Sequence, residues 1–371
     1  MGAGAHGTGA SLPPVDEHVL EMTVATPGQG VVTKRKGDAD FHAFPCSLGL
    51  LGVTLTLTLR CVPKHLLRER TQVLTRREAV RRHAELIQDN RHVRFMWIPF
   101  ADAVVVVSNN PTFDGCLGAG QGYEPRHDMD YRLEPFRSLL KDVSGDDGEG
   151  LGFAELRDAL LAVKPLDLDH VKSINRAEAE FWRRSQGTHV GDSSTKLNFE
   201  CGGQQWVNEC CFPAGTRSEP DGKDMRYMLR LLDIIESEGI PAPAPIEQRW
   251  TAGSTSLLSP ARSTAEDALF SWVGIIMYRR RRLTPHAIDA PRLHLRPRPS
   301  QVPAVRRRAR AEEHRRRVPE VQGTVREGPL ACLWCPRALG QGRGRRARPG
   351  AVEEALGCGR SDALRGRSKN V

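Results

Sequence analysis

The sequence of 371 residues has no apolar run long enough to cross a membrane as a helix. A spanning helix needs roughly 18–20 apolar residues, and the longest runs here are all shorter. These runs are SLGLLGVTLTLTL (47–59), AVVVV (103–107) and ALFSWVGIIMY (268–278). The first residues also lack the features of a signal peptide or of an Arg- and Ser-rich transit peptide. The sequence therefore supplies no targeting information of its own.

A disulfide framework and a metal site are also lacking. The nine cysteines are odd in number and irregularly spaced, so we interpret them as free thiols in a reducing compartment. Cys332 and Cys335 form a C-x-x-C pair, but no second pair completes four zinc ligands. In SGDDGEGLGFAE, an EF-hand loop starting at Ser144 would need glycine where Glu149 stands, so we predict a solvated loop.

Charge is divided unevenly along the chain. Residues 279–371 carry 24 Lys and Arg against 8 Asp and Glu, whereas residues 1–278 carry 30 against 37. The basic segment has many Arg and Pro residues, few large apolar residues and no sustained period, so we predict that it is disordered. An Arg-rich arm that binds nucleic acid is a further interpretation of charge alone.

Period-two patterns predict several strands. VLEMTVATP, GVVTKRK and VTLTLTLRCV (53–62) alternate, which indicates three strands within residues 1–62. HVRFMWIPFADAVVVVSN (92–109) predicts two strands around a turn, and ALFSWVGIIMY predicts a buried strand.

Helical patterns follow in three places. Residues 75–90 begin with a Thr75–Glu78 capping box, and residues 153–163 are amphipathic. Residues 223–239 predict a third helix that ends at a glycine. Residues 110–150 are rich in Gly and Asp and are predicted to be loop-like.

Three kinds of stretch are candidates for chemistry: glycine-rich loops, a cysteine-rich stretch and a charged extended segment. Gly4, Gly7 and Gly9 around His6 could let backbone approach a ligand, and LGLLG (48–52) has the same character. A histidine in such a loop is more often a turn residue bonded to backbone than an acid or base. In CGGQQWVNECCFPAGT (201–216), no His-Asp arrangement accompanies Cys201, which favours a buried structural thiol over a nucleophile.

The third stretch is IEQRW (246–250), which follows three alternating prolines and is predicted to be extended. In an extended segment, Glu247 and Arg249 project from one face, about 6.5–7 Å apart. Such a pair could hold the hydroxyls and carbonyl of a sugar lactone, and the guanidinium could stabilise negative charge on substrate or cofactor. A surface ion pair is the alternative.

Several long stretches together resemble one family. They are GAHGTGASLPPVDE (4–17), HVRFMWIPFADAVVVV (92–107), AEAEFWRRSQG (177–187), CGGQQWVNECCFPAGT (201–216), GIPAPAPIEQRWTA (239–252) and DALFSWVGIIMY (267–278). In content and order they resemble plant and algal L-galactono-1,4-lactone dehydrogenases, which are aldonolactone oxidoreductases of the vanillyl-alcohol-oxidase flavoprotein class. The resemblance covers about residues 4–278 and is weakest over residues 110–150.

The resemblance implies an α+β fold. Residues 1–62 would be the C-terminal part of a vanillyl-alcohol-oxidase-type FAD-binding domain. Residues 63–278 would be the substrate, or cap, domain with an antiparallel sheet and flanking helices, followed by the basic tail 279–371.

The resemblance also implies a function. These enzymes hold FAD, here expected to be non-covalent, and oxidise L-galactono-1,4-lactone to L-ascorbate with electrons passed to cytochrome c. They act at the mitochondrial inner membrane on the intermembrane-space side and take part in assembly of respiratory complex I. No nucleic-acid partner is expected, because a basic tail translated out of frame has no selected charge. The alternatives are a D-arabinono-1,4-lactone oxidase that uses oxygen and a non-catalytic assembly role.

Individual residues carry over from the resemblance. Glu247 and Arg249 match the Glu-x-Arg pair that positions the lactone beside the flavin, and Cys201 matches an oxidation-sensitive thiol near the substrate channel. The residues that match flavin-domain segments where backbone meets FAD are Gly4, Ala5, His6, Gly7, Thr8, Gly9, Leu48, Gly49, Gly52 and Val53.

The sequence departs from the family at both ends. The family's earlier FAD segment does not precede the glycine loop, and RRRRLTPHAID stands where the family continues past its IIMY strand. Codons for Leu333–Gly344, read in a shifted frame, are compatible with F-G-A-H-E-H-W-A-K-V-E, close to a family motif. We therefore expect that residues from about 279 are translated out of frame, and that the chain as written neither holds FAD nor turns over.

Overall fold

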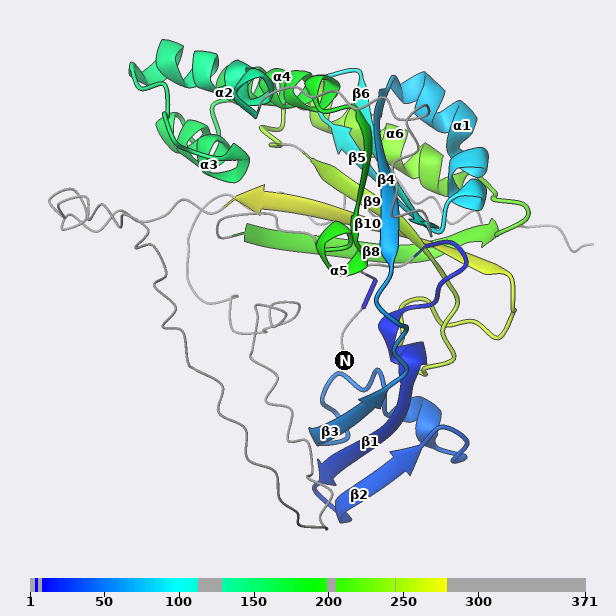
Figure 1. Ribbon diagram of the computed structural model, residues 1–371. Helices are drawn as coiled ribbons and strands as arrows, with labels where there is room; N and C mark the ends of the chain where they lie inside the picture. Colours follow the sequence, from blue (N-terminus) through cyan, green and yellow to red (C-terminus); the bar gives the residue numbers. More distant parts are fainter. Residues whose placement is uncertain (1–3, 6–8, 113–128, 199–204, 244, 279–371) are drawn as a thin grey trace, which may run out of the picture. The chain divides into compact units, whose positions relative to one another are not determined.

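The computed structural model describes residues 4–5, 9–112, 129–198, 205–243 and 245–278. Within these residues the strands form two sheets in which every neighbouring pair is antiparallel (Figure 1). The basic tail lies outside the described residues. No helix in the described ranges combines the length and apolarity needed to span a membrane.

The first sheet confirms the three strands predicted near the start. Its order is β2-β1-β3, where β1 is Val19–Thr26, β2 is Gly30–Arg35 and β3 is Val53–Leu59. Two short 3-10 helices accompany it, η1 (Val15–His18) and η2 (Phe41–Ala43). A small core of apolar side chains from β1 and η2 supports this sheet, but every residue of β3 is exposed.

The second sheet has the order β7-β4-β6-β5-β9-β10-β8. Its strands are β4 (Leu66–Leu74), β5 (His92–Ile98), β6 (Ala103–Thr112), β7 (Gly187–Asp192), β8 (Gln205–Thr216), β9 (Ile246–Ala252) and β10 (Ala268–Tyr278). The two strands expected around the Pro-Phe-Ala-Asp turn, the extended IEQRW segment and the buried ALFSWVGIIMY strand are confirmed. Strands β4, β7 and β8 were not predicted from the sequence.

Helices α1 (Arg76–Asp89) and α6 (Lys223–Ser237) pack side by side on one face of this second sheet (Figure 1). The predicted capping box is present, because the Thr75 hydroxyl accepts the Glu78 N–H and the Glu78 carboxylate accepts the Thr75 N–H. Helix α6 is followed by Gly239 with φ +62°, which confirms the glycine stop. Together the two helices and the sheet form the largest apolar core.

A cluster of three helices corrects one prediction. Helix α2 (Met129–Ser144) packs with α3 (Phe153–Val163) and α4 (Leu168–Arg184), and a short α5 (Ser193–Lys196) follows β7. Residues 129–144 were expected to be loop-like, but Leu133, Phe136 and Leu140 recur at helical spacing and are buried in this cluster. The Gly and Asp content around the segment hid that period.

The boundary predicted at 62/63 falls in the connection between the two sheets, since β3 ends at Leu59 and β4 begins at Leu66. The division into a flavin domain and a substrate domain stays a prediction. What the sheet arrangement does establish is the position of β9, which lies between β5 and β10.

Candidate functional site

Strand β9 sends its side chains alternately to the two faces of the seven-stranded sheet. On the face covered by α1 and α6, Trp250 joins the apolar core and Gln248 accepts a hydrogen bond from Trp97 Nε1 at 2.9 Å. Glu247 and Arg249 project to the opposite face. The predicted common face of these two residues is therefore confirmed.

Glu247 and Arg249 form a buried ion pair. Arg249 Nη2 donates a hydrogen bond to Glu247 Oε2. Arg249 is only 7% exposed and Glu247 only 4%. The surface ion pair considered as an alternative is therefore wrong. In the neighbouring strand β10, Trp272 lies opposite Arg249 and Gly274 lies opposite Glu247. The two residues therefore belong to adjacent cross-strand rows of the same face, Arg249 with Trp272 and Glu247 with Gly274.

Two further charged residues project to this face and were not predicted from the sequence: Arg94 of β5, which lies opposite Arg249, and Glu209 of β8. Glu209 lies opposite Gly274, on the other side of β10 from Glu247. Burial raises the pKa of Glu209, the positive charge of Arg249 acts to lower it, and the negative charge of Glu247 raises it further; the net pKa is raised. Only the register of β8 against β10 places this carboxyl near the pair, and nothing in the local sequence signals it.

The start of the predicted cofactor loop reaches the same face. Ala5 is buried in a small cluster with Phe270 and Trp272, and Trp272 is the cross-strand neighbour of Arg249. The structure therefore brings the beginning of the glycine loop close to the strand pair that carries the ion pair.

Two glycines of this loop have packing reasons of their own. Gly4 has φ +62°, and a Cβ there would lie 2.5 Å from Val15 Cγ1. At Gly9 a Cβ would lie 1.8 Å from the carbonyl oxygen of Arg91. Both positions need glycine for contacts within the protein, and their cofactor role stays a prediction. His6, Gly7 and Thr8 lie outside the described residues.

The second glycine stretch forms a turn that leads into β3. Gly52 has φ +139°, and a Cβ there would lie 2.1 Å from the carbonyl oxygen of Ala25 in β1. Gly49 has φ +77° with no described atom near its missing Cβ, and Leu48 and Val53 are exposed. The contacts of this turn are with the three-stranded sheet, and the described contacts do not bring it to the ion pair.

The loop after β9 is tied to the segment before β1. Ser254 Oγ donates to Asp16 Oδ2 at 2.5 Å, and Thr255 N donates to Glu17 Oε1 at 2.6 Å. Burial acts to raise the pKa of Glu17, but the bonds from Thr255 and the charge of Lys36 outweigh it, so the net pKa is lowered. These contacts fix the carboxyl end of β9 against the chain that follows the glycine loop.

The predicted redox thiol, Cys201, lies outside the described residues. Two cysteines of the same stretch are described, Cys210 and Cys211, and both are free and half-buried. Burial raises the pKa of both thiols, which disfavours the reactive thiolate.

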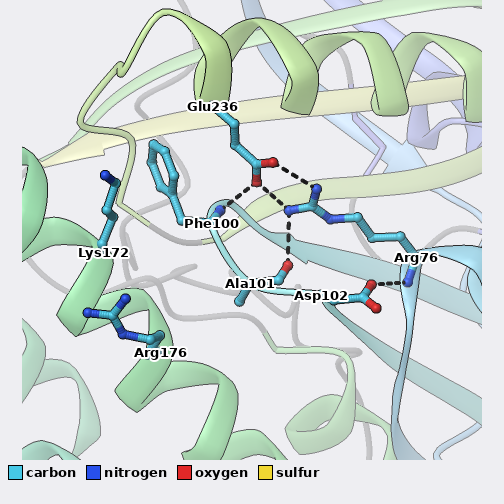
Figure 2. Close-up of a pocket in the computed structure, with 7 residues that line it drawn as sticks. All are labelled: Arg76, Phe100, Ala101, Asp102, Lys172, Arg176 and Glu236. Atoms are coloured by element: carbon cyan, nitrogen blue, oxygen red, sulfur yellow. Dashed lines mark hydrogen bonds and ion pairs between the residues drawn. The ribbon is translucent and has the colours of Figure 1, made fainter.

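A hollow of about 420 Å³ lies elsewhere, between α1, α4, α6 and the turn from β5 to β6 (Figure 2). Arg76 donates to Glu236 at 2.5 Å, and Glu236 accepts the backbone N–H of Phe100 at 2.7 Å. The hydrogen bond from Arg76 is the main cause that lowers the pKa of Glu236. We interpret these bonds as a brace for the turn at Phe100, which has φ +60°. Ala101, Asp102, Lys172 and Arg176 complete the lining.

Comparison with known families gives one match over most of the chain. The family model described as D-arabinono-1,4-lactone oxidase matches residues 57–128 and 151–288. The match therefore contains strands β4 to β10, including Glu209, Glu247 and Arg249.

Curated relatives match at the level of sequence. The chain is 49% identical over 285 residues to L-galactono-1,4-lactone dehydrogenase 2, mitochondrial, of Oryza sativa subsp. japonica, covering 74% of this chain and 49% of the relative. It is 47% identical over 291 residues to L-galactono-1,4-lactone dehydrogenase, mitochondrial, of Arabidopsis thaliana, covering 74% and 48%. The chain thus spans about half the length of the curated relatives it matches.

A solved structure shares the fold. Cholesterol oxidase from B. sterolicum matches with a TM-score of 0.53 and 12% identity, over 74% of this chain and 56% of that chain. At this identity the likeness shows the fold alone. It agrees with the predicted class, an α+β fold of the vanillyl-alcohol-oxidase type with an antiparallel sheet and flanking helices.

Proposed function

The chain belongs to the D-arabinono-1,4-lactone oxidase family, and on that premise we propose that its Glu247–Arg249 site binds a sugar 1,4-lactone for flavin-dependent oxidation. Identity of 47–49% to plant L-galactono-1,4-lactone dehydrogenases favours L-galactono-1,4-lactone as the substrate and L-ascorbate as the product. The observation that carries the proposal is the buried ion pair on β9. An oxidase that acts on D-arabinono-1,4-lactone with oxygen is the second candidate, favoured by the family description.

The ion pair has the groups that a lactone needs. A guanidinium carries five N–H donors, and a carboxylate accepts several hydrogen bonds. Arg249 would donate to the oxygen atoms of the lactone, and Glu247 would accept from its hydroxyls. Because the pair is buried, its charges act on the substrate with little screening and orient the C2 hydroxyl. Arg249 would also stabilise negative charge that develops during the reaction.

The buried positive charge of Arg249 is one feature of the described residues that suits a flavin ring on this face. Arg249 places a buried positive charge on the side of the sheet where Ala5 packs, and positive charge near a flavin ring stabilises its reduced form. A bound flavin would supply the two-electron acceptor for the hydride lost from C2 of the lactone. We propose that the cofactor of the complete enzyme is non-covalent FAD, and that this chain, which spans about half the length of its relatives, does not retain it alone. In the second glycine stretch, Gly49 has open space where a ligand could lie.

The test is a titration of the purified chain with L-galactono-1,4-lactone, followed by intrinsic tryptophan fluorescence. Trp272 lies opposite Arg249, so binding should change the emission. We expect saturable binding that is lost in Arg249→Met and kept in Arg230→Met, which alters an exposed arginine of α6. Absence of saturable binding to either L-galactono- or D-arabinono-1,4-lactone would contradict the proposal.

Flavin retention is measured on the same preparation. Visible absorbance after incubation with FAD and desalting tests the expectation that the chain as written does not hold the cofactor. If the protein is yellow, reduction of cytochrome c on addition of lactone supports the proposed acceptor, whereas oxygen consumption favours the oxidase. A site at the mitochondrial inner membrane, facing the intermembrane space, is proposed from the family resemblance and from relatives named mitochondrial.

A further inference from the structure

Three strands place two carboxyl groups on either side of one glycine. Glu209 of β8 and Glu247 of β9 both lie opposite Gly274 of the strand between them, β10. Cross-strand partners in an antiparallel sheet project to the same face. The order across the sheet is therefore carboxylate, bare backbone, carboxylate.

Gly274 has no packing reason that the structure describes. Its φ is not in the left-handed region, and a Cβ built there would meet only Glu209 Oε1 among the described atoms, at 3.8 Å. That distance is an ordinary van der Waals contact. Glycine in the middle of a strand is unfavourable because it packs nothing and loses much chain entropy. Among the described residues nothing else occupies the space above Gly274, so its bare backbone leaves room for a ligand on this face.

Glu209 differs from Glu247 in its partners. Glu247 is bonded to Arg249, whereas the Glu209 carboxyl makes no hydrogen bond or ion pair within the part of the chain that the structure describes. The Glu209 oxygens are not among the fully buried unpartnered atoms, so they remain accessible, and the hydroxyl donors of a ligand could take the place of water there. Burial raises the pKa of Glu209, which is the expected consequence of this environment.

We propose that Glu209 and Gly274 form a substrate subsite, in which the Glu209 carboxyl accepts hydroxyl groups of a neutral polyhydroxy lactone lying over Gly274. The inference rests on the proposed function and extends it to substrate charge. Two carboxyl groups lie on this face beside two guanidiniums, those of Arg249 and of Arg94, its partner in β5, and together they favour a neutral ligand with several hydroxyl groups. Glu209 lies at the side of the row away from both guanidiniums and would repel the carboxylate of the ring-opened aldonate. Glu209 is thus assigned as the residue that distinguishes the lactone from its open acid.

Substitutions at the two positions separate binding from folding. Glu209→Gln keeps the shape but removes the charge, and Gly274→Ala adds one methyl group where a Cβ fits. The matched controls are Glu85→Gln, an exposed residue of α1, and Gly28→Ala, which has open space around its missing Cβ. Each full-length variant is titrated with L-galactono-1,4-lactone and with L-galactonate by tryptophan fluorescence, and its melting temperature is measured.

We expect Glu209→Gln to bind the lactone about tenfold more weakly, because a hydrogen bond to a charged group is lost. The preference for lactone over L-galactonate should also fall about tenfold, since the repulsive charge is gone. Gly274→Ala should weaken lactone binding without lowering the melting temperature, and both controls should bind like the natural sequence. A purely structural role of Glu209 would not change the ratio of the two affinities.

Two results would overturn the inference, and they are distinguishable. If Glu209→Gln and Gly274→Ala leave both affinities unchanged while Arg249→Met abolishes binding, the subsite is wrong and the proposed function stands. If the natural sequence binds neither ligand, the proposed function fails and the subsite fails with it.

Discussion

Strands β3 and β9 are both seven residues long, yet their surroundings are opposite. All seven residues of β3 are exposed, including Leu55 and Leu57 at 52% and 40%. Six of the seven residues of β9 are buried, including a glutamate, a glutamine and an arginine. β3 is an edge strand of the three-stranded sheet, whereas β9 lies between β5 and β10.

The comparison shows that the polarity of a strand does not determine its burial. VTLTLTL alternates leucine and threonine, which is typical of a strand with one covered face. IEQRWTA is more polar, but its polar side chains are paired. Gln248 and Thr251 accept hydrogen bonds from tryptophans of the neighbouring strands, and Glu247 and Arg249 pair with each other. Position in the sheet and cross-strand neighbours decide burial, as is general for β-structure.

The largest expected effect tests whether burial makes the charges of β9 indispensable. Arg249→Met leaves Glu247 buried without its partner, which should cost about 3–5 kcal/mol of unfolding free energy. Urea denaturation measures this, with the exposed Arg230→Met as control. Adding Glu247→Gln to Arg249→Met should recover part of the loss. If Arg249→Met and Arg230→Met lower the unfolding free energy equally, burial does not make the arginine of β9 more important to stability than an exposed one.

A somewhat smaller effect is expected beneath β9. Asp224 is fully buried. Its Oδ2 accepts hydrogen bonds from Trp250 Nε1 at 2.7 Å and from Gln248 Nε2 at 3.3 Å. Asp224→Ala removes the acceptor of both bonds, leaves Gln248 Nε2 only its bond to Ser271 Oγ, and should cost about 2–3 kcal/mol. Thermal unfolding gives the value, with Asp233→Ala on the exposed side of α6 expected to cost little. If Asp224→Ala lowers the unfolding free energy no more than Asp233→Ala does, the hydrogen bonds of Asp224 do not stabilise β9.

Glu17 links the two regions and should make their connection sensitive to pH. Its folded pKa lies below its ordinary value of 4.5. The ionised carboxylate therefore stabilises the fold above that value, and the stabilisation is lost as pH falls through the folded pKa. Glu17→Gln should lose about 1 kcal/mol at neutral pH and little at low pH. Melting curves from pH 7 to pH 3 measure this; parallel pH profiles for variant and natural sequence would contradict it.

The smallest effect on stability is expected in β3. Leu57→Lys should change the unfolding free energy by less than about 0.5 kcal/mol, because the residue is exposed. It should lower aggregation, since a charge on an edge strand discourages pairing with another chain. Light scattering during heating measures the second effect. A clear loss of stability would mean that β3 is covered in solution and is buried much as β9 is.

Much of the local structure could be predicted from sequence. The capping box at Thr75, the stop at Gly239 and the common face of Glu247 and Arg249 all depend on neighbouring residues, and each is confirmed. Such features need no knowledge of the rest of the fold. The buried state of the ion pair did need it, because burial depends on the strands to either side of β9.

The misses share a physical cause. Helix α2 has a clear apolar period, but a proline within it and the Gly- and Asp-rich residues around it obscured the signal. Glu209 acquires its place only from the register of β8 against β10. The reasons for Gly4 and Gly9 lie in close contacts with the Val15 side chain and the Arg91 carbonyl. Sequence near each residue contains none of this information.

The bonds between the loop after β9 and the start of the chain also constrain the timing of folding. Ser254 and Asp16 are 238 positions apart in the sequence, and Thr255 and Glu17 are equally distant. Contacts of such separation form slowly, because a long chain must close before they contribute. During synthesis, the segment around Asp16 cannot form these hydrogen bonds until residue 255 has left the ribosome. The three-stranded sheet, with its exposed β3, therefore spends most of translation without the attachment that anchors it.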